Sequence, residues 1–232
     1  MFMPFFDPTF ILVILGLALS GMASAYVNST YRKYDEVRSQ RGVTATEAAR
    51  YILDDAGIHD VQIRQISGDL TDNYDAKNKL LSLSESTADS TSVAAIGVAA
   101  HEVGHAIQDH TNYLPLRLRA GLVPLTNIGT TISFPLIILG VIMSWNQTLI
   151  HIGIAAFAIA LIFQLVTLPV EFNASMRAVS ILANGDLLNS EEVPLVKKVL
   201  TAAALTYVAA ALATFLQLLR LVLLFGNNRD NN

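Results

Sequence analysis

Cysteine is absent from this 232-residue chain, and charged side chains are scarce. Without cysteine, the chain can form no disulfide and offers no thiolate to a metal ion. Asp, Glu, Lys and Arg make up only 15% of the residues, whereas apolar types make up 53%. Because this balance is more apolar than that of a soluble domain of similar length, it indicates a membrane protein.

The chain also lacks the features that recruit nucleic acids or nucleotides. Acidic residues number 19 against 15 basic ones, and no segment interleaves basic and aromatic residues as a nucleic-acid surface would. Neither a glycine-rich phosphate loop nor an internal repeat occurs. We therefore expect no nucleic acid among its partners, which leaves the bilayer and the polar segments as the places where function resides.

Four apolar stretches are long enough to cross the ~30 Å hydrocarbon core of a bilayer. They are Phe10–Tyr26, Leu122–Met143, Leu149–Val170 and Val199–Phe225. We expect a mainly α-helical polytopic membrane protein with a small α+β domain between its first and second spans. Its expected parts are an anchor (1–26), a polar domain (27–121), a transmembrane hairpin (122–170), a polar helix (171–198), and a last span with a tail (199–232).

The first apolar stretch has the wrong flanking charges for a secretory signal peptide. Residues 1–9 contain Asp7 but no lysine or arginine. The cations follow the stretch instead, at Arg32, Lys33, Arg38 and Arg41. A cleaved signal carries its positive charge before the apolar segment. We therefore expect an uncleaved anchor, even though residues 23–25 resemble a cleavage site.

Positive charges also predict the orientation in the membrane, because cytoplasmic loops carry an excess of lysine and arginine. Both polar segments, 27–121 and 171–198, hold such residues, and we expect both in the cytoplasm. The basic residues beyond the first cluster are Arg117, Arg119, Arg177, Lys197 and Lys198. The uncharged loop at 144–148 and both termini would then lie outside. Arg220, inside the last span, must reach the interface or face protein.

The stretch from His101 to His105 reads HEVGH. On a helix, side chains four apart share a face, so both imidazoles can bind one tetrahedral Zn²⁺. Glu102 points about 100° away from His101, which leaves it free to act as the catalytic base of a hydrolysis. The bare pattern also occurs on ordinary helices. Here, however, Glu102 is the only charged residue besides the histidines between Val93 and Gln108, and such a helix should be buried. A buried carboxylate beside imidazoles favours a metal.

A catalytic zinc site normally has three protein ligands, so a third ligand is needed. The longer H-E-x-x-H-x-x-G-x-x-H motif, which supplies a third histidine, is absent. Gln108 and Thr111 occupy its glycine and histidine positions. Three other histidines remain. His110 falls on the wrong face of the same helix, His59 follows a predicted turn, and His151 lies at the outer end of the third span.

Glu171 is the better candidate for the third ligand. It follows Pro169-Val170, where the third span is expected to reach the cytoplasm, and it is expected to open a helix that ends near residues 184–185. A carboxylate at a helix start can merely complement the helix dipole, which is worth about 0.3–1 kcal/mol. Because the histidine pair and Glu171 fall on the same predicted side of the membrane, we predict one Zn²⁺ per chain at the membrane surface.

Within the polar domain, Thr44 and Glu47 predict a capping box that opens a helix ending at Gly57. Short strands are expected at residues 61–66 and 79–84, with a turn region at 68–75 between them. The second strand, with Leu81, Ser82 and Leu83, precedes the histidine helix. If it is an edge strand, it can pair with an extended substrate; alternatively, its leucines simply pack on the helix.

Several segments together resemble the YugP-type neutral zinc metallopeptidases of bacterial membranes. They are residues 70–75, 81–84, 92–108, 169–175 and 199–210. The resemblance implies a membrane-embedded, gluzincin-like endopeptidase of a bacterial cell, with a layout similar to HtpX and the CAAX-prenyl endopeptidases. Those relatives carry a Glu-x-x-x-Asp segment, whose glutamate corresponds to Glu171. Ser175 stands at the Asp position, and a hydroxyl orients an imidazole less strongly than a carboxylate does.

Three residues could stabilise the transition state of such a hydrolysis: Arg177, Tyr113 and Tyr207. Each also has a simpler explanation. Tyrosines commonly anchor a helix at the membrane interface, and an arginine contributes to the cytoplasmic positive charge. The sequence does not decide between these explanations.

The predicted function is hydrolysis of peptide bonds in proteins or peptides, including membrane proteins during processing or quality control. A second hypothesis is a catalytically inactive membrane scaffold that keeps zinc. Structural zinc sites have four protein ligands, and only three convincing ones are found here, which favours catalysis. A metal-ion carrier would need more polar residues along its spans. Nothing in the sequence indicates the oligomeric state.

Overall fold

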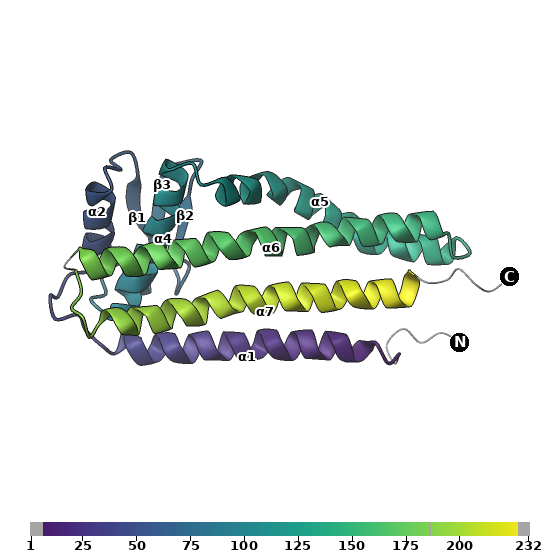
Figure 1. The fold of residues 1–232 in the computed structure, drawn as a ribbon, viewed down its shortest axis with the longest axis horizontal. Helices are drawn as coiled ribbons and strands as arrows, with labels where there is room; N and C mark the ends of the chain where they lie inside the picture. The colour runs from purple at the N-terminus through teal and green to yellow at the C-terminus, as the bar shows by residue number, and fades with distance from the viewer. Residues whose placement is uncertain (1–6, 186, 227–232) are drawn as a thin grey trace. The chain divides into compact units, whose positions relative to one another are not determined.

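The structure is a computed structural model, and it describes residues 7–185 and 187–226 (Figure 1). The chain is mostly helical (73%) and includes a small three-stranded sheet. In chain order the elements are α1 (Phe10–Asp35), α2 (Ala45–Asp55), β1 (Gln62–Ile66), β2 (Asn73–Asp75), β3 (Leu80–Ser84), α3 (Glu85–Ala88), α4 (Val93–His110), α5 (Leu114–Ile142), α6 (Gln147–Asn184) and α7 (Val193–Phe225). The predicted segments before Asp7 and after Gly226 lie outside the described residues.

Four of these helices, α1, α5, α6 and α7, are long and apolar enough to cross a membrane. This confirms the expected mainly helical chain with four candidate spans. The expected start of a new helix at Glu171 is wrong, because α6 continues through Pro169 to Asn184. The apolar pattern keeps its phase past the proline: Val170, Ala174 and Leu182 are all fully buried at multiples of four residues. Packing along this stripe sustains the helix where the local sequence suggests a break.

The described residues group into two compact units, and the first comprises residues 7–23, 118–168 and 206–226. Within it, glycines bring α5 and α6 close together. A Cβ atom built on Gly129 would lie 2.7 Å from the carbonyl oxygen of Ala156, and one built on Gly153 would lie 2.8 Å from that of Ser133. Such small residues let helix backbones approach closely, which is how helices pack in lipid.

Arg220 lies in this first unit and does not stand alone in its apolar helix. Its Nη2 atom is 3.1 Å from Oδ2 of Asp7, and its guanidinium lies 5.7 Å from the centre of the Phe10 ring. The Arg220 side chain is 13% exposed. The ion pair and the aromatic ring therefore explain how the last apolar helix accommodates an arginine, in line with the expectation that it faces protein.

The second unit comprises residues 24–117 and 169–205 and holds the sheet. The strand order is β1-β3-β2, with β3 parallel to β1 and antiparallel to β2. The expected strands at 61–66 and 79–84 are therefore confirmed. The expected turn region at 68–75 is wrong in part, because its last residues form β2, whose Asn73 and Asp75 are residue types that rarely favour strands.

The predicted edge position of Leu81, Ser82 and Leu83 is also wrong, because β3 is the central strand. Ser82 pairs with Arg64 of β1 and Asn73 of β2, so its backbone is engaged on both sides. Leu81 and Leu83 are fully buried in the core, which agrees with the alternative that they pack against the helix. A two-residue alternation reveals a buried face but not the number of neighbouring strands.

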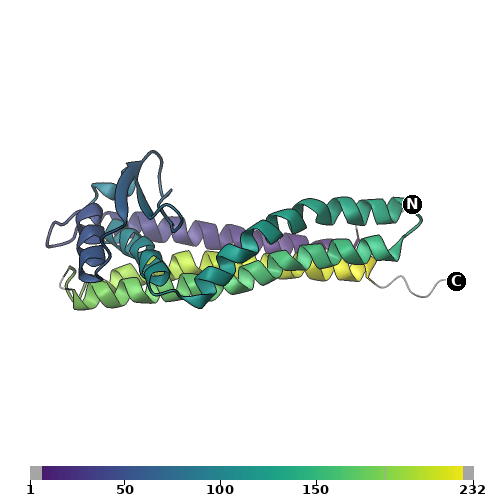
Figure 2. The ribbon, with the colours of Figure 1, turned by 90° about the horizontal axis from the view of Figure 1, so that it is seen from above.

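The α2 helix begins with the predicted capping box. The Thr44 hydroxyl accepts from the Glu47 amide, and the Glu47 carboxylate accepts from the Thr44 amide at 2.8 Å. The helix ends at Asp55, and Gly57 follows with a φ of +69°. Beside α2 lies α4, as both ribbon views show (Figures 1 and 2).

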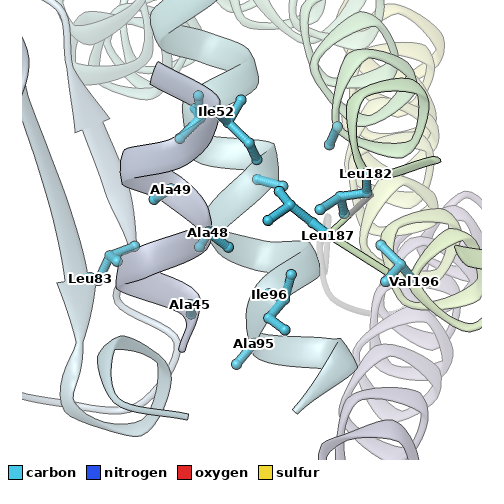
Figure 3. Close-up of a cluster of buried hydrophobic side chains, with 14 of the residues drawn as sticks. Ala45, Ala48, Ala49, Ile52, Leu83, Ala95, Ile96, Leu182, Leu187 and Val196 are labelled. Carbon is cyan, nitrogen blue, oxygen red and sulfur yellow. The ribbon is translucent and has the colours of Figure 1, made fainter. Parts of the chain in front are cut away.

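The core of the second unit surrounds α4. Figure 3 shows Ala95 and Ile96 of α4 with α2 and Leu83 on one side and with Leu182, Leu187 and Val196 on the other. Alanines line the facing side of α2, and their small side chains let the two helices lie close together. The helix that carries the histidine pair is therefore held on both sides by apolar contacts.

Candidate metal centre

The α4 helix starts with a cap and continues as an apolar core helix. The Ser92 hydroxyl accepts from the Ala95 amide at 3.0 Å and so satisfies one of the free amides of the first turn. The helix then runs for 18 residues to His110, and most of its side chains are buried. This burial was expected from the scarcity of charge. It packs α4 firmly and so holds in place the helix face that carries His101 and His105.

His101, His105 and Glu171 come together although 70 residues separate the first from the last. Glu171 Oε2 lies 3.2 Å from His101 Nε2 and 3.5 Å from His105 Nε2. Their potential ligand atoms all lie within 4.8 Å of one another. Glu171 is only 3% exposed and His105 only 7%. Two imidazole nitrogens and one carboxylate oxygen that converge in a mostly buried place are a donor set that fits Zn²⁺.

A glycine allows the two helices that carry these residues to meet. A Cβ atom built on Gly104 would lie 2.7 Å from the carbonyl oxygen of Ala174, which is closer than real Cβ contacts allow. Gly104 precedes His105, and Ala174 lies one helical turn beyond Glu171. The α4 and α6 backbones are therefore in direct contact beside the three converging side chains.

Gln108 fixes the orientation of the His105 ring. Its Nε2 atom donates to the carbonyl oxygen of Val170 at 2.8 Å and to Oδ1 of Asn173 at 3.0 Å. Since a backbone carbonyl only accepts, the amide oxygen of Gln108 must face His105 Nδ1, 3.0 Å away. The Nδ1 proton of His105 is thereby held by Gln108, so that Nε2, once deprotonated, could offer its lone pair to a metal.

Ser175 does the same for the other imidazole. Its Oγ atom lies 3.1 Å from His101 Nδ1, on the ring side opposite the Nε2 atom that faces Glu171. Nδ1 can therefore donate to the hydroxyl while Nε2 points toward the metal position. Ser175 is thus within hydrogen-bonding distance of the imidazole, but it brings no negative charge.

Glu102 is not part of the converging group, as its offset on α4 predicts. Burial raises the pKa of Glu102, and the neighbouring histidines oppose this shift. Burial by itself would lower the pKa of His105, but the hydrogen bond with Glu171 and the charge of Glu102 outweigh it and raise that pKa. A carboxylate with a raised pKa holds a proton more strongly than an ordinary glutamate, which suits a group that must take a proton from water.

The other histidines take no part in a comparable group among the residues that the structure describes. His59 is exposed and lies 3.5 Å from Asp54. His110 is exposed at the end of α4, and His151 is exposed on α6. The geometry therefore selects Glu171 as the third side chain, while the metal-binding roles of all three residues remain predictions.

The three candidates for transition-state stabilisation have different surroundings. Arg177 Nε donates to Asn173 Oδ1 at 2.8 Å, the same oxygen that accepts from Gln108. Arg177 is thus linked to His105 through two amide side chains. Tyr113 follows α4 in the second unit, and its amide donates to the Gln108 carbonyl. Tyr207 belongs to the first unit.

Gln108 and Asn173 are the residues that the sequence interpretation missed. Gln108 was read only as a mismatch to a longer histidine motif. The available signal was its position three residues after His105, which places both side chains on one face of a helix. Its burial to 0% exposure shows that this amide belongs to the interior and needs the partners described above.

An apolar groove of about 300 Å³ lies beside this centre, between α6 and α7. Phe172 and Met176 line it from α6 and Leu200 from α7, while Lys197 is its only charged lining residue among those described. Ser175 also lines the groove, so the residue that contacts His101 borders this space as well.

Two imidazoles and one carboxylate that converge, in a chain with four membrane-length helices, are the arrangement expected of a membrane protein with a zinc site. The chain belongs to the family described as "Putative neutral zinc metallopeptidase", which matches residues 9–226. It is 45% identical to the "Putative membrane protease YugP" of Bacillus subtilis (strain 168) over 221 residues, which cover 95% of this chain and 98% of the relative. The expected family is thus confirmed. No solved structure matches the chain.

Proposed function

We propose that this protein is an integral-membrane zinc endopeptidase that hydrolyses peptide bonds at the cytoplasmic surface of the membrane. The observation that carries the proposal is the convergence of His101 Nε2, His105 Nε2 and Glu171 Oε2, with Glu102 left out of the group. Three ligands and a separate carboxylate are what a hydrolytic zinc site requires.

Each residue then has a distinct task. His101, His105 and Glu171 would hold Zn²⁺, which when bound would supply a Lewis acid for the peptide carbonyl and the attacking water. Glu102 accepts a proton from that water while the water oxygen bonds to the carbonyl carbon. It returns the proton to the amide nitrogen as the carbon–nitrogen bond breaks. Gln108 and Ser175 hold the imidazole rings in the orientation that leaves both Nε2 atoms free.

The groove beside the centre supports a preference for apolar segments of substrate. It shares Ser175 with the site, and its walls are mostly apolar. A peptide whose scissile bond lies at the metal could place an apolar side chain against Phe172 and Leu200. Proteins or peptides with exposed apolar segments, including membrane proteins, are therefore the proposed substrates, in processing or quality control.

The cytoplasmic location rests on charge. The four candidate spans come from the structure, and the lysines and arginines around residues 27–121 and 171–198 assign these segments to the cytoplasmic side by the positive-inside rule. The relative from Bacillus subtilis is named as a membrane protease, which supports a bacterial membrane as the location.

The decisive experiment compares Glu102→Gln with the wild type. We expect the variant to keep the zinc content of the wild type but to cleave labelled casein roughly 10²–10⁴-fold more slowly, because only the base is lost. Glu171→Ala and His105→Ala should lose both zinc and cleavage. Glu191→Gln, which changes an exposed glutamate, is the matched control and should change neither.

Two outcomes would contradict the proposal. If Glu102→Gln cleaves casein like the wild type, Glu102 is not the base. If the wild type binds zinc but cleaves neither casein nor a membrane-protein substrate, the chain is better described as a zinc-binding scaffold. Zinc content is measured by atomic emission on the purified full-length protein, and cleavage is measured in the same samples.

A further inference from the structure

A second cavity in the same compact unit lies between α1 and α7 and has a different character. It has a volume of about 290 Å³. Its lining consists of Tyr26, Ser29, Thr30, Lys33 and Tyr34 from α1 and Lys198 from α7. No carboxylate is found among these described lining residues. Two cations and several hydroxyls therefore surround a space near the lower size limit of a ligand pocket.

The two lysines converge on one aromatic ring. Lys33 Nζ lies 5.5 Å and Lys198 Nζ 5.9 Å from the centre of the Tyr34 ring. Tyr34 itself is buried, with 8% exposure. Neither ammonium group forms an ion pair within 4.0 Å with a carboxylate of the described residues. Two like charges thus lie beside one ring and line one cavity, and the ring attracts both without neutralising them.

The general rules for lysines near membranes do not account for this convergence. Cytoplasmic positive charge requires lysines close to a span, but it does not require them to meet at a cavity. Helix electrostatics do not favour Lys198 either, because it lies nearer the positive N-terminal end of α7 than the C-terminal end, where a cation would be stabilised. An anion between the two ammonium groups would offset both the repulsion and this unfavourable position.

We propose that this cavity binds the phosphate group of an anionic phospholipid. Lysine ammonium groups bind phosphate as point charges, and hydroxyls can donate hydrogen bonds to its oxygens. The Ser29 hydroxyl donates to the Tyr26 carbonyl, which leaves the hydroxyls of Tyr26, Thr30 and Tyr34 among the lining residues to donate to a phosphate. The cavity accommodates a head group, while the acyl chains would follow the apolar surfaces of α1 and α7.

The position of the cavity favours a lipid over a soluble phosphate. Both α1 and α7 are apolar enough to cross a bilayer, and the cavity begins at Tyr26, where the apolar run of α1 ends. Tyr26 is 49% exposed, and tyrosines are enriched at the level of lipid head groups. Basic pockets between membrane helices are places where phospholipid head groups bind.

The test measures lipid binding to the purified full-length protein in a neutral detergent, which removes the general attraction of an anionic membrane surface. Native mass spectrometry compares phosphatidylglycerol with phosphatidylcholine, and a third arm adds inorganic phosphate. We expect the wild type to retain phosphatidylglycerol preferentially. Lys33→Gln/Lys198→Gln should bind it at least tenfold more weakly, since about 1 kcal/mol per lysine is lost. Lys33→Arg/Lys198→Arg should bind it like the wild type.

A matched control removes the same charge from the same helices. Arg32 and Lys197 are the neighbours of Lys33 and Lys198, and neither lines the cavity. Arg32→Gln/Lys197→Gln should therefore keep phosphatidylglycerol binding within about twofold of the wild type. If this control loses binding as much as the cavity variant does, the effect is general electrostatics and the proposal is overturned. If inorganic phosphate displaces the lipid at equal concentration, the site is one for a free anion, and the lipid assignment is overturned.

A third variant keeps both lysines, in case their replacement unfolds the protein. Ser29→Glu places a carboxylate at an exposed position on the cavity wall, where it would satisfy the ammonium groups in place of the lipid. We expect it to abolish phosphatidylglycerol binding while the melting temperature stays at or above that of the lipid-free wild type. Normal lipid binding by Ser29→Glu would overturn the proposal.

Discussion

Gln108 joins α4 to α6 with a single amide, because it contacts His105 on one side and Val170 and Asn173 on the other. Removing it frees the His105 ring and leaves the Val170 carbonyl without this donor. We expect Gln108→Ala to weaken zinc binding by about 10–100-fold, as the loss of a residue behind a metal ligand commonly does. The dissociation constant is measured by competition with a fluorescent chelator. Gln65→Ala, at an exposed position on β1, is the control, and equal affinities in the two variants would refute the role.

A second prediction concerns the missing side chain of Gly104. A methyl group at this position would meet the Ala174 carbonyl oxygen at 2.7 Å, and a backbone atom cannot rotate away. We expect Gly104→Ala to push α6 from α4, separate Glu171 from the histidines, and lower zinc content to less than half of the wild-type value. Gly121→Ala should leave zinc content unchanged, since nothing lies within 4 Å of that position. Full zinc content in Gly104→Ala would show that zinc binding does not require the close contact between α4 and α6.

The side chains that approach one another in the site were largely predictable, because their chemistry is specific. A histidine pair four residues apart on an apolar helix has few other uses, and Glu171 was the carboxylate best placed to join it. Gln108 was not predictable in the same way. A buried amide gains its role from whatever packs against it, and the contact with Val170 depends on how α4 and α6 meet.

At the scale of elements, the groove between α6 and α7 gives a prediction about substrate rather than metal. Thr201 lines the groove from an exposed position on α7. Under the proposed function, Thr201→Trp fills the space that receives apolar side chains, and we expect KM for casein to rise roughly tenfold. Zinc content should not change, and Thr201→Ala should behave like the wild type. Unchanged kinetics in Thr201→Trp would mean that the substrate lies elsewhere.

The elements themselves were predictable where a local signal exists, and less so where pairing decides. The Thr44–Glu47 capping box predicted the start of α2, and the alternating leucines predicted β3. The central place of β3 depends on β2, a three-residue strand whose composition suggests a turn. Likewise, Pro169 suggested a helix boundary that the buried stripe of α6 overrides. In each case a contact from a distant part of the chain outweighs the local preference.

At the scale of the whole chain, the compact unit that contains the metal centre is discontinuous in sequence. Residues 24–117 supply the histidine helix and residues 169–205 supply Glu171. The intervening residues 118–168 belong to the other unit. The candidate centre therefore forms only when these two segments have folded together, and zinc binding there would be coupled to that folding.

The absence of cysteine allows a direct test of the predicted orientation, because each introduced cysteine is the only thiol in the chain. The loop at 144–148 is expected outside. Asn146 caps α6 by accepting from the Leu149 amide, so the exposed Thr148 is the safer reporter. For the cytoplasmic side, Ser39 is only 5% exposed, whereas Ala76 lies in an exposed turn. Asn231, a reporter for the C-terminal tail, lies outside the described residues.

In intact cells, we expect an impermeant maleimide to label Thr148→Cys and to spare Ala76→Cys, because the lysines and arginines of residues 27–121 predict a cytoplasmic location for that segment. After the cells are opened, both variants should be labelled equally, which controls for the reactivity of each thiol. Labelling of Ala76→Cys alone in intact cells would invert the topology. The candidate metal centre would then face outward, since His101, His105 and Glu171 share a compact unit with Ala76.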